Sequence, residues 1–99
     1  MNRSCNGYCY IYLIQCSNSN YYKIGVSENP EERLECLQIG CPYKLHIVIT
    51  SLITNKAEAI KVEMETHQKL SQYKIHHEWF KLPINILNIL KKEMILGSE

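Results

Sequence analysis

Aspartate is absent from this 99-residue chain, and arginine is scarce. All ten acidic residues are glutamates, and only two of the eleven basic residues are arginines. Two-metal nuclease and polymerase sites usually depend on paired aspartates, so the composition argues against them. A site with one metal ion and one carboxylate stays open. The net charge of +1 gives no ground, by itself, for predicting nucleic-acid binding.

Long apolar runs and paired cysteines are also lacking. No apolar run approaches the roughly eighteen residues that span a bilayer, and no secretory signal precedes the first expected strand. The five cysteines are odd in number and contain no Cys-x-x-Cys pair. A disulfide framework or a zinc knuckle is therefore disfavoured, and reduced thiols are expected. These absences predict an intracellular protein, in the cytoplasm or in a host nucleus if viral, that is neither secreted nor membrane-bound.

The length suits one domain, 1–99, with a single modest core. Periodicity predicts strands at 8–14, 21–26 and 45–53, helices at 30–39 and 56–72, a short extended segment at 78–82, and a final helix over about 83–96. A polar turn is expected at 73–77. The fold class is α/β of the α+β type, in the order β-β-α-β-α-(short β)-α. Its sheet is expected to be small, three-stranded, mainly antiparallel and flanked by helices, with a core at about 7–82.

Helix boundaries carry the clearest local signals. Asn29 precedes Pro30, which is the pattern of an N-cap followed by the first helical residue. Gly40 and Pro42 follow the same helix, as is common after a helix C-terminus. Asn55 is expected to cap the longer helix.

Apolar spacing also predicts which side of each element is buried. Strand 45–53 is expected to place Leu45, Ile47 and Ile49 on one face and His46, Val48 and Thr50 on the other. The expected inward residues of the three helices are Leu34, Leu37 and Ile39; Ala57, Ile60, Met64 and His67; and Ile84, Leu87, Leu90 and Ile95. The same helical wheel turns Val62 outward.

Glu63 is the unusual charge of the long helix. It projects beside Ile60 and His67, at the margin of the predicted apolar stripe. A carboxylate in such a place needs a partner or a metal ion. Glu63 is therefore a candidate metal ligand, with a buried network to His67 as the alternative interpretation.

Three short motifs have the order and spacing of a known family. They are Tyr10-Ile11-Tyr12, Lys23-Ile24-Gly25 and Arg33, which lies one turn into the next expected helix. With them the chain resembles the GIY-YIG endonuclease superfamily over about residues 7–82. The likeness is strongest to a phage and large-virus branch often described as a DNA-binding domain. That branch has a tyrosine-x-lysine-isoleucine-glycine motif and a later glutamate-tryptophan-phenylalanine, here residues 21–25 and 78–80.

The resemblance implies phosphodiester hydrolysis with one Mg²⁺ or Mn²⁺ ion. Carried over residue by residue, Tyr12 activates the water, Arg33 holds the phosphate and Glu63 holds the metal. The supporting candidates are Tyr10, Tyr22, Gly25 and His67. Plain alternatives remain: Tyr12 could serve only in packing, and Arg33 could be a solvated residue paired with Glu32.

The sequence departs from the superfamily pattern at two places. Ile75 and His76 stand where many family nucleases carry asparagine, and Lys23 stands where the second motif usually begins with tyrosine. A tyrosine with an ordinary pKa of about 10 is a poor base at neutral pH. If Tyr12 and Lys23 were cross-strand neighbours, the ammonium would favour the phenolate. The alternative is that Lys23 contacts a phosphate without a catalytic role.

Two functions from different classes follow as predictions. The first is a metal-dependent endonuclease acting on DNA. The second is a non-catalytic nucleic-acid-binding module, for which the candidate contacts are Lys23, Arg33, Lys44, Lys56 and Lys74. A weaker third is an interaction module or inhibitor on the same scaffold. RNA is not excluded as the ligand, and a chain this short is expected to obtain specificity from a homodimer, a partner protein or a structural feature of the substrate. A composition rich in asparagine, isoleucine, lysine and tyrosine suits a virus or phage.

Overall fold

Five strands and three helices follow one another in the order β-β-α-β-α-β-β-α in the computed structural model, which describes residues 8–96. The elements are β1 (Cys9–Cys16), β2 (Tyr21–Ser27), α1 (Pro30–Ile39), β3 (Leu45–Ile53), α2 (Lys56–Lys69), a 3-10 turn (Ser71–Tyr73), β4 (Lys74–His76), β5 (Trp79–Lys81) and α3 (Ile84–Leu96). The predicted α+β class is confirmed. In the described residues, no helix combines the length and the apolar character needed to cross a bilayer.

The strands form one antiparallel sheet in the order β3-β1-β2-β5-β4. The prediction of three strands is wrong, because β4 and β5 form a hairpin that extends the sheet beyond β2. β4 has three residues, all exposed, in the segment predicted to be a polar turn. So short and polar a strand has no apolar alternation to reveal it, and pairing with β5 is what makes it a strand.

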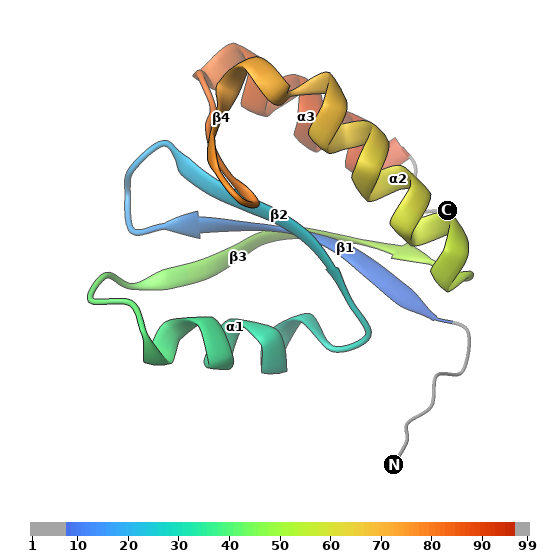
Figure 1. Cartoon of the computed structure of the whole chain (residues 1–99), viewed down its shortest axis with the longest axis horizontal. Coiled ribbons are helices and arrows are strands. Elements are labelled where there is room, and N and C mark those ends of the chain that lie inside the picture. Colours follow the sequence, from blue (N-terminus) through green and yellow to red (C-terminus); the bar gives the residue numbers. More distant parts are fainter. Residues whose placement is uncertain (1–7, 97–99) are drawn as a thin grey trace.

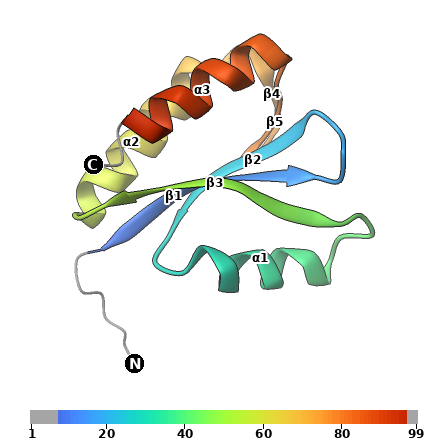
Figure 2. The same ribbon diagram turned by 180° about the vertical axis from the view of Figure 1, so that it is seen from behind.

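Helices cover both faces of the sheet, as Figures 1 and 2 show: α1 lies on one face, and α2 and α3 lie together on the other. The larger core forms on the α2–α3 side and includes Leu13, Ile24 and Phe80, all without exposed surface. The smaller core forms on the α1 side around Tyr12 and Ile14. Alternation along β1 therefore sends successive side chains into two different cores.

The predicted start of α1 is confirmed in detail. The Asn29 side chain accepts a hydrogen bond from the backbone N–H of Glu32 at 3.1 Å, Pro30 opens the helix, and Gly40 follows its last residue. Asn55 caps α2 in the same way, accepting from the N–H of Glu58 at 3.1 Å. These caps satisfy N–H groups that have no partner within the helix.

The predicted inner faces of the helices need correction. On α2, Ala59 and not Ala57 is buried, Ile60 and Met64 are exposed, and Val62 packs against the larger core. The small Ala59 side chain suits a close approach of the helix to the sheet, and this turns the helix relative to the expected stripe. On α1, Leu34 and Leu37 pack inward as predicted, whereas Ile39 is exposed. On α3, the buried residues are Leu87, Leu90 and Met94, whereas Ile84 and Ile95 are exposed.

A bulge in β3 overturns the expected alternation of that strand. Leu13 lies opposite Ile49 and the next residue, Ile14, lies opposite Ile47, so Val48 is an extra residue in β3. Val48 and Ile49 both pack against the larger core, while Ile47 packs against the smaller one. An inserted residue of this kind bends a strand and shifts every later side chain to the other face.

Candidate active site

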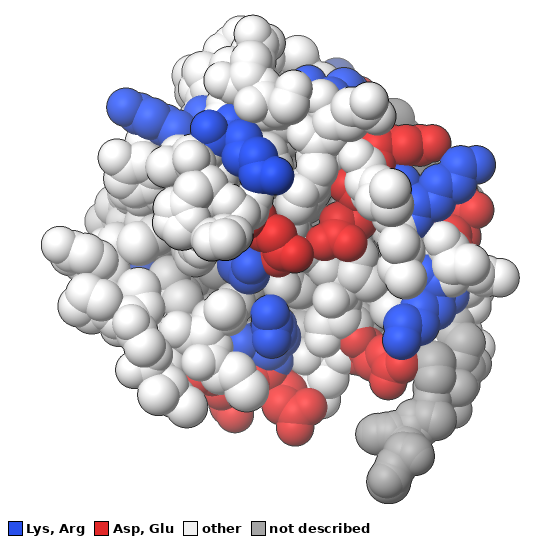
Figure 3. Space-filling view, in the orientation of Figure 1, with Lys and Arg blue, Asp and Glu red and all other residues white. Residues whose placement is uncertain are grey.

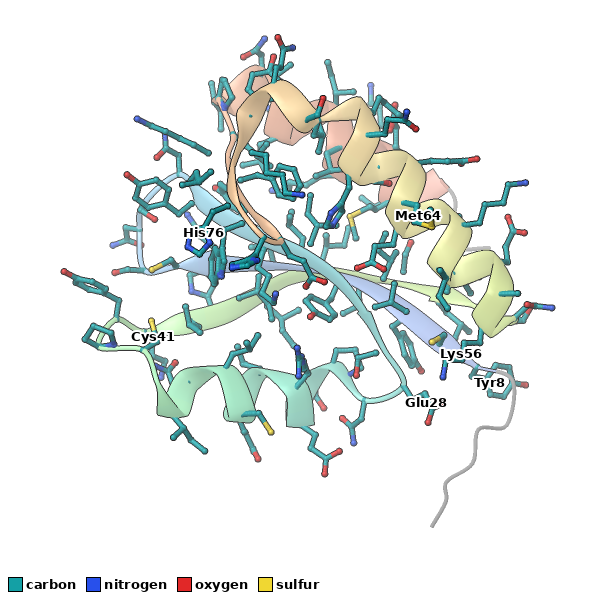
Figure 4. The ribbon with its side chains drawn as sticks, viewed as in Figure 1. Tyr8, Glu28, Cys41, Lys56, Met64 and His76 are labelled. Carbon is teal, nitrogen blue, oxygen red and sulfur yellow. The ribbon has the colours of Figure 1, made fainter. Side chains whose placement is uncertain are left out.

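The candidate site lies where the pairing of β2 with β5 ends. β5 pairs with β2 at Tyr21, Tyr22 and Lys23, and from Ile24 onward this edge borders a cleft. The cleft has a volume of about 1150 Å³. Its lining comes from β1, β2, α1, α2 and the turn before β5, and includes Tyr10, Tyr12, Arg33, Lys56, Glu63 and Glu78. Tyr8, Glu28 and Lys56 lie near one another at one end of the sheet (Figure 4).

Tyr12 lies against its cross-strand partner Gly25 and near Arg33. A Cβ atom at position 25 would lie 2.6 Å from Cζ of Tyr12, so only glycine lets the phenol ring lie across the neighbouring strand. The Arg33 guanidinium lies near the Tyr12 hydroxyl and acts on its ionisation. Burial raises the pKa of Tyr12 above its ordinary value, and the interaction with Arg33 opposes that rise. In this environment Tyr12 is a neutral phenol at neutral pH.

Lys23 is not the cross-strand neighbour of Tyr12 that the sequence hypothesis required. Its position opposite in β1 is Ile14, and Gly25 occupies the position opposite Tyr12. Lys23 Nζ instead forms an ion pair of 2.6 Å with Glu78 Oε1, and the lysine side chain is only 8% exposed. The cation that acts on the ionisation of the Tyr12 hydroxyl is therefore Arg33.

Glu78 reaches Lys23 from the two-residue turn of the β4–β5 hairpin. His77, the first residue of this turn, has a φ of 56°, in the left-handed region that few residues other than glycine adopt. Glu78 is half-buried and also accepts, through its carbonyl, a hydrogen bond of 3.2 Å from Ile24 N–H. Backbone and side chain together thus fix the carboxylate at the inner side of the cleft.

Glu63 faces the same cleft from α2. Its carboxylate is about four-fifths buried, and Oε2 lies 4.0 Å from Nε2 of His67. Burial and the negative charge of Glu78 raise the pKa of Glu63, while His67 and Lys23 oppose that rise. A carboxylate whose ionisation is opposed by burial and by a neighbouring negative charge, as that of Glu63 is, favours the binding of a cation beside it.

His67 has a structural role in the described chain. Its Nε2–H donates a hydrogen bond of 2.9 Å to the carbonyl of Ile24, and its ring packs edge-on against Phe80 at 4.9 Å. These contacts hold α2 against the unpaired edge of β2. They also fix the position of Glu63, which lies one helical turn earlier, relative to the cleft.

The structure brings together part of the predicted set. Tyr10, Tyr12, Arg33, Lys56 and Glu63 line the cleft, and Lys23 and Lys74 line an adjoining depression with Arg33, Glu63 and Glu78. Tyr22 lies on the opposite face of the sheet, in the larger core, and is not part of the site. Lys44 lies in the loop after α1, beyond the opposite end of that helix from Arg33.

Sequence reasoning missed Glu78 as a site residue, although its motif was recognised. The available signal was Lys23 in an apolar strand, because a buried lysine requires an acidic partner. Nothing in the sequence pattern pointed to Glu78, 55 residues later, as that partner.

Charge on this face is mixed. Figure 3 shows acidic and basic side chains side by side rather than a continuous basic surface. Within residues 8–96, no three histidine, cysteine or glutamate side chains gather as metal ligands. Mg²⁺ nevertheless binds proteins through one or two carboxylates while keeping several waters. The largely buried side chain of Glu63, with Glu78 nearby, fits that kind of site.

The fold and the cleft together define a small antiparallel α+β domain in which a buried tyrosine, an exposed arginine and two carboxylates line one cleft. The family model of the T5orf172 domain matches residues 7–94, and the chain belongs to this phage-associated family. Comparison with curated proteins and with solved structures found no match.

Proposed function

We propose that this protein is a metal-dependent endonuclease of the GIY-YIG type, hydrolysing phosphodiester bonds in DNA with one Mg²⁺ or Mn²⁺ ion. The observation that carries the proposal is the convergence of Tyr12, Arg33 and Glu63, from three separate elements, on one cleft. Two likenesses support the proposal. The chain belongs to the phage-associated T5orf172 family, and its motifs resemble those of the GIY-YIG superfamily.

Each residue has a distinct part in the proposed reaction. Arg33 binds a phosphoryl oxygen of the scissile group through its guanidinium, because guanidinium presents several donors in a plane. Glu63 would hold the divalent cation, which would supply positive charge to stabilise the negative charge that develops in phosphodiester hydrolysis. Tyr12 accepts the proton of the attacking water through its hydroxyl oxygen.

This mechanism requires Tyr12 to lose its hydroxyl proton before it can act as a base. Burial favours the neutral phenol, and a neutral phenol cannot take a proton from water. A cation bound at Glu63 would add positive charge to the cleft, as Arg33 already does, and a nearby positive charge favours the phenolate. We therefore expect turnover to increase with pH over the neutral and alkaline range.

A non-catalytic nucleic-acid-binding module is the second candidate function. Its support is the Tyr12 side chain, which is 1% exposed and so hardly reached by a water nucleophile. Lys56 and Lys74 are exposed beside the two depressions and would contact phosphates in such a module. DNA is proposed as the ligand in both functions, with RNA as an outcome of the test.

Nicking of supercoiled plasmid in Mn²⁺ separates the two functions. Glu63→Ala should abolish nicking, and Glu65→Ala is the matched control because Glu65 lies exposed on the same helix and outside the cleft. Retained binding with no nicking by the wild type would favour the binding module. Equal nicking by wild type and Glu63→Ala would refute the proposed site. A labelled RNA of the same sequence, assayed in parallel, compares the two nucleic acids.

A further inference from the structure

A second groove lies at the other end of the molecule and is lined by three cysteines. Cys16 at the end of β1, Cys36 on α1 and Cys41 just after α1 border a space of about 590 Å³, together with Trp79. In Figure 4, Cys41 and His76 lie at the opposite end of the sheet from Lys56 and Glu28. This groove takes no part in the proposed hydrolysis.

Cys16 and Cys41 both line this groove, and both side chains pack against the smaller core. The Cys41 thiol lies near enough to Cys16 to affect its ionisation. Burial and the adjacent Cys41 thiol raise the pKa of Cys16. Both residues are half-buried, so small molecules in solution still reach them. Cys36, by contrast, is exposed on the helix surface.

Backbone hydrogen bonds hold both cysteines in place. The carbonyl of Cys16 accepts from Ser19 N–H at 3.1 Å, and the next residue, Ser17, donates its N–H to the Lys44 carbonyl at 2.6 Å. On the other side, Cys41 N–H donates to the Gln38 carbonyl at 3.1 Å, and the Gln38 side chain donates to the Cys41 carbonyl at 3.3 Å. The loop after α1 and the turn after β1 are thus tied to each other, and both cysteines are held at the same groove.

Metal binding is not the chemistry that this groove favours. His76 and Cys36 line it as well, yet among residues 8–96 no three such side chains converge as ligands. Two neighbouring thiols without further ligands have a different reaction open to them, which is oxidation to a disulfide.

We propose that Cys16 and Cys41 form a redox-active dithiol that hydrogen peroxide converts into an intramolecular disulfide. One thiolate attacks a peroxide oxygen, the O–O bond breaks, hydroxide leaves and a sulfenic acid forms. The second sulfur then attacks the sulfenic sulfur, the S–O bond breaks and water leaves. Two thiols and one peroxide give one disulfide and two waters, so the two electrons lost by sulfur reduce the peroxide. The product joins the turn after β1 to the loop after α1.

Peptide mass spectrometry after peroxide treatment tests this assignment in the full chain. Trypsin cleavage after Arg3, Lys23, Arg33 and Lys44 separates Cys16 from Cys41, but it leaves Cys5 and Cys9 in the peptide of Cys16 and Cys36 in the peptide of Cys41. Fragmentation of the cross-linked peptide identifies which cysteine of residues 4–23 is joined. The key comparison therefore uses Cys36→Ser, which should form the cross-linked peptide at the wild-type rate. That rate should not depend on protein concentration. Cys16→Ser and Cys41→Ser should lose the cross-link, and circular dichroism checks that both variants fold.

Each result decides the assignment. A cross-linked product lighter by two hydrogens in wild type and Cys36→Ser, reversed by a thiol reductant, supports it. Because the disulfide closes the segment between residues 16 and 41, the oxidised Cys36→Ser protein should also melt higher, by roughly 10 °C or more. Over-oxidised single thiols, a cross-link that forms only between molecules, or a cross-link that survives Cys41→Ser would overturn it. If the serine variants fail to fold, fragmentation of the cross-linked Cys36→Ser peptide still shows whether the bond starts at Cys16, and a bond from Cys5 or Cys9 would overturn the assignment.

Discussion

Replacing Glu78 by glutamine tests whether the buried ammonium of Lys23 depends on that carboxylate. The ion pair measures 2.6 Å, and the lysine side chain is 8% exposed against 39% for Glu78. Removing one partner of a fully buried pair costs about 3–5 kcal/mol, because the remaining charge stays out of water. Since Glu78 is partly solvated, we expect a loss of about 2 kcal/mol. For a domain of this size that loss lowers Tm by roughly 8–16 °C.

An exposed ion pair on the same protein supplies the control. Lys69 and Glu93 approach to 3.1 Å, but their side chains are 63% and 51% exposed. Glu93→Gln should therefore cost less than about 1 kcal/mol. Lys23→Met should cost less than Glu78→Gln, because Glu78 can be hydrated when left alone. The double variant should likewise be more stable than Glu78→Gln, since it leaves no unpaired buried charge.

Urea and thermal unfolding at pH 7, followed by circular dichroism, measure all four proteins against the wild type. The decisive quantity is the difference between Glu78→Gln and Glu93→Gln in the free energy of unfolding. If the two losses agree within about 0.5 kcal/mol, Lys23 does not depend on Glu78 and the argument from burial is refuted. A double variant less stable than Glu78→Gln would contradict it as well.

Three further predictions concern the cleft itself. Gly25→Ala should cost about 1–3 kcal/mol in thermal unfolding and abolish nicking, because its Cβ would displace the Tyr12 ring. The pKa of Tyr12 is raised in the folded state, so the unfolded chain ionises first and stability falls as pH rises past about 10. An alkaline titration should show a smaller fall for Tyr12→Phe, and an equal fall would contradict the assignment. The pKa of Glu63 is also raised, so its contribution to stability is lost as pH rises above about 4.3. Glu63→Gln should therefore be more stable than wild type at pH 7 in urea, with the gap closing near pH 4, while nicking is lost.

Local signals in the sequence predicted the elements whose boundaries they mark. α1 and β3 have their predicted bounds, because Asn29, Pro30 and Gly40 delimit the helix and a run rich in leucine, isoleucine and valine forms the strand. The bulge at Val48 and the two strands beyond β2 depend instead on which segments pair. Pairing between distant segments leaves no trace in the alternation of a three-residue strand.

The site shows the same division between local and distant information. Glu63 lines the cleft although the predicted buried face of α2 was turned, since it lies beside both the expected stripe and the observed one that contains Ala59 and Val62. The relation of Lys23 to Tyr12 was mispredicted because it depends on hairpin register, which the loop of residues 17–20 sets. The register decides which residues are cross-strand neighbours. The hypothesis placed Lys23 opposite Tyr12, whereas the observed register, shifted by two residues, places Gly25 there.

The backbone hydrogen bonds of Ile24 affect whether the edge of β2 can pair with a strand of another molecule. Sheet edges with free peptide groups can recruit a strand from another chain and so begin aggregation. At the point where β5 stops, the N–H of Ile24 is taken by the Glu78 carbonyl and its C=O by the His67 imidazole. An incoming strand would have to break both bonds. The side of β2 that opens onto the cleft is thereby protected from intermolecular pairing, and replacing His67 would lower solubility as well as disturb the position of Glu63.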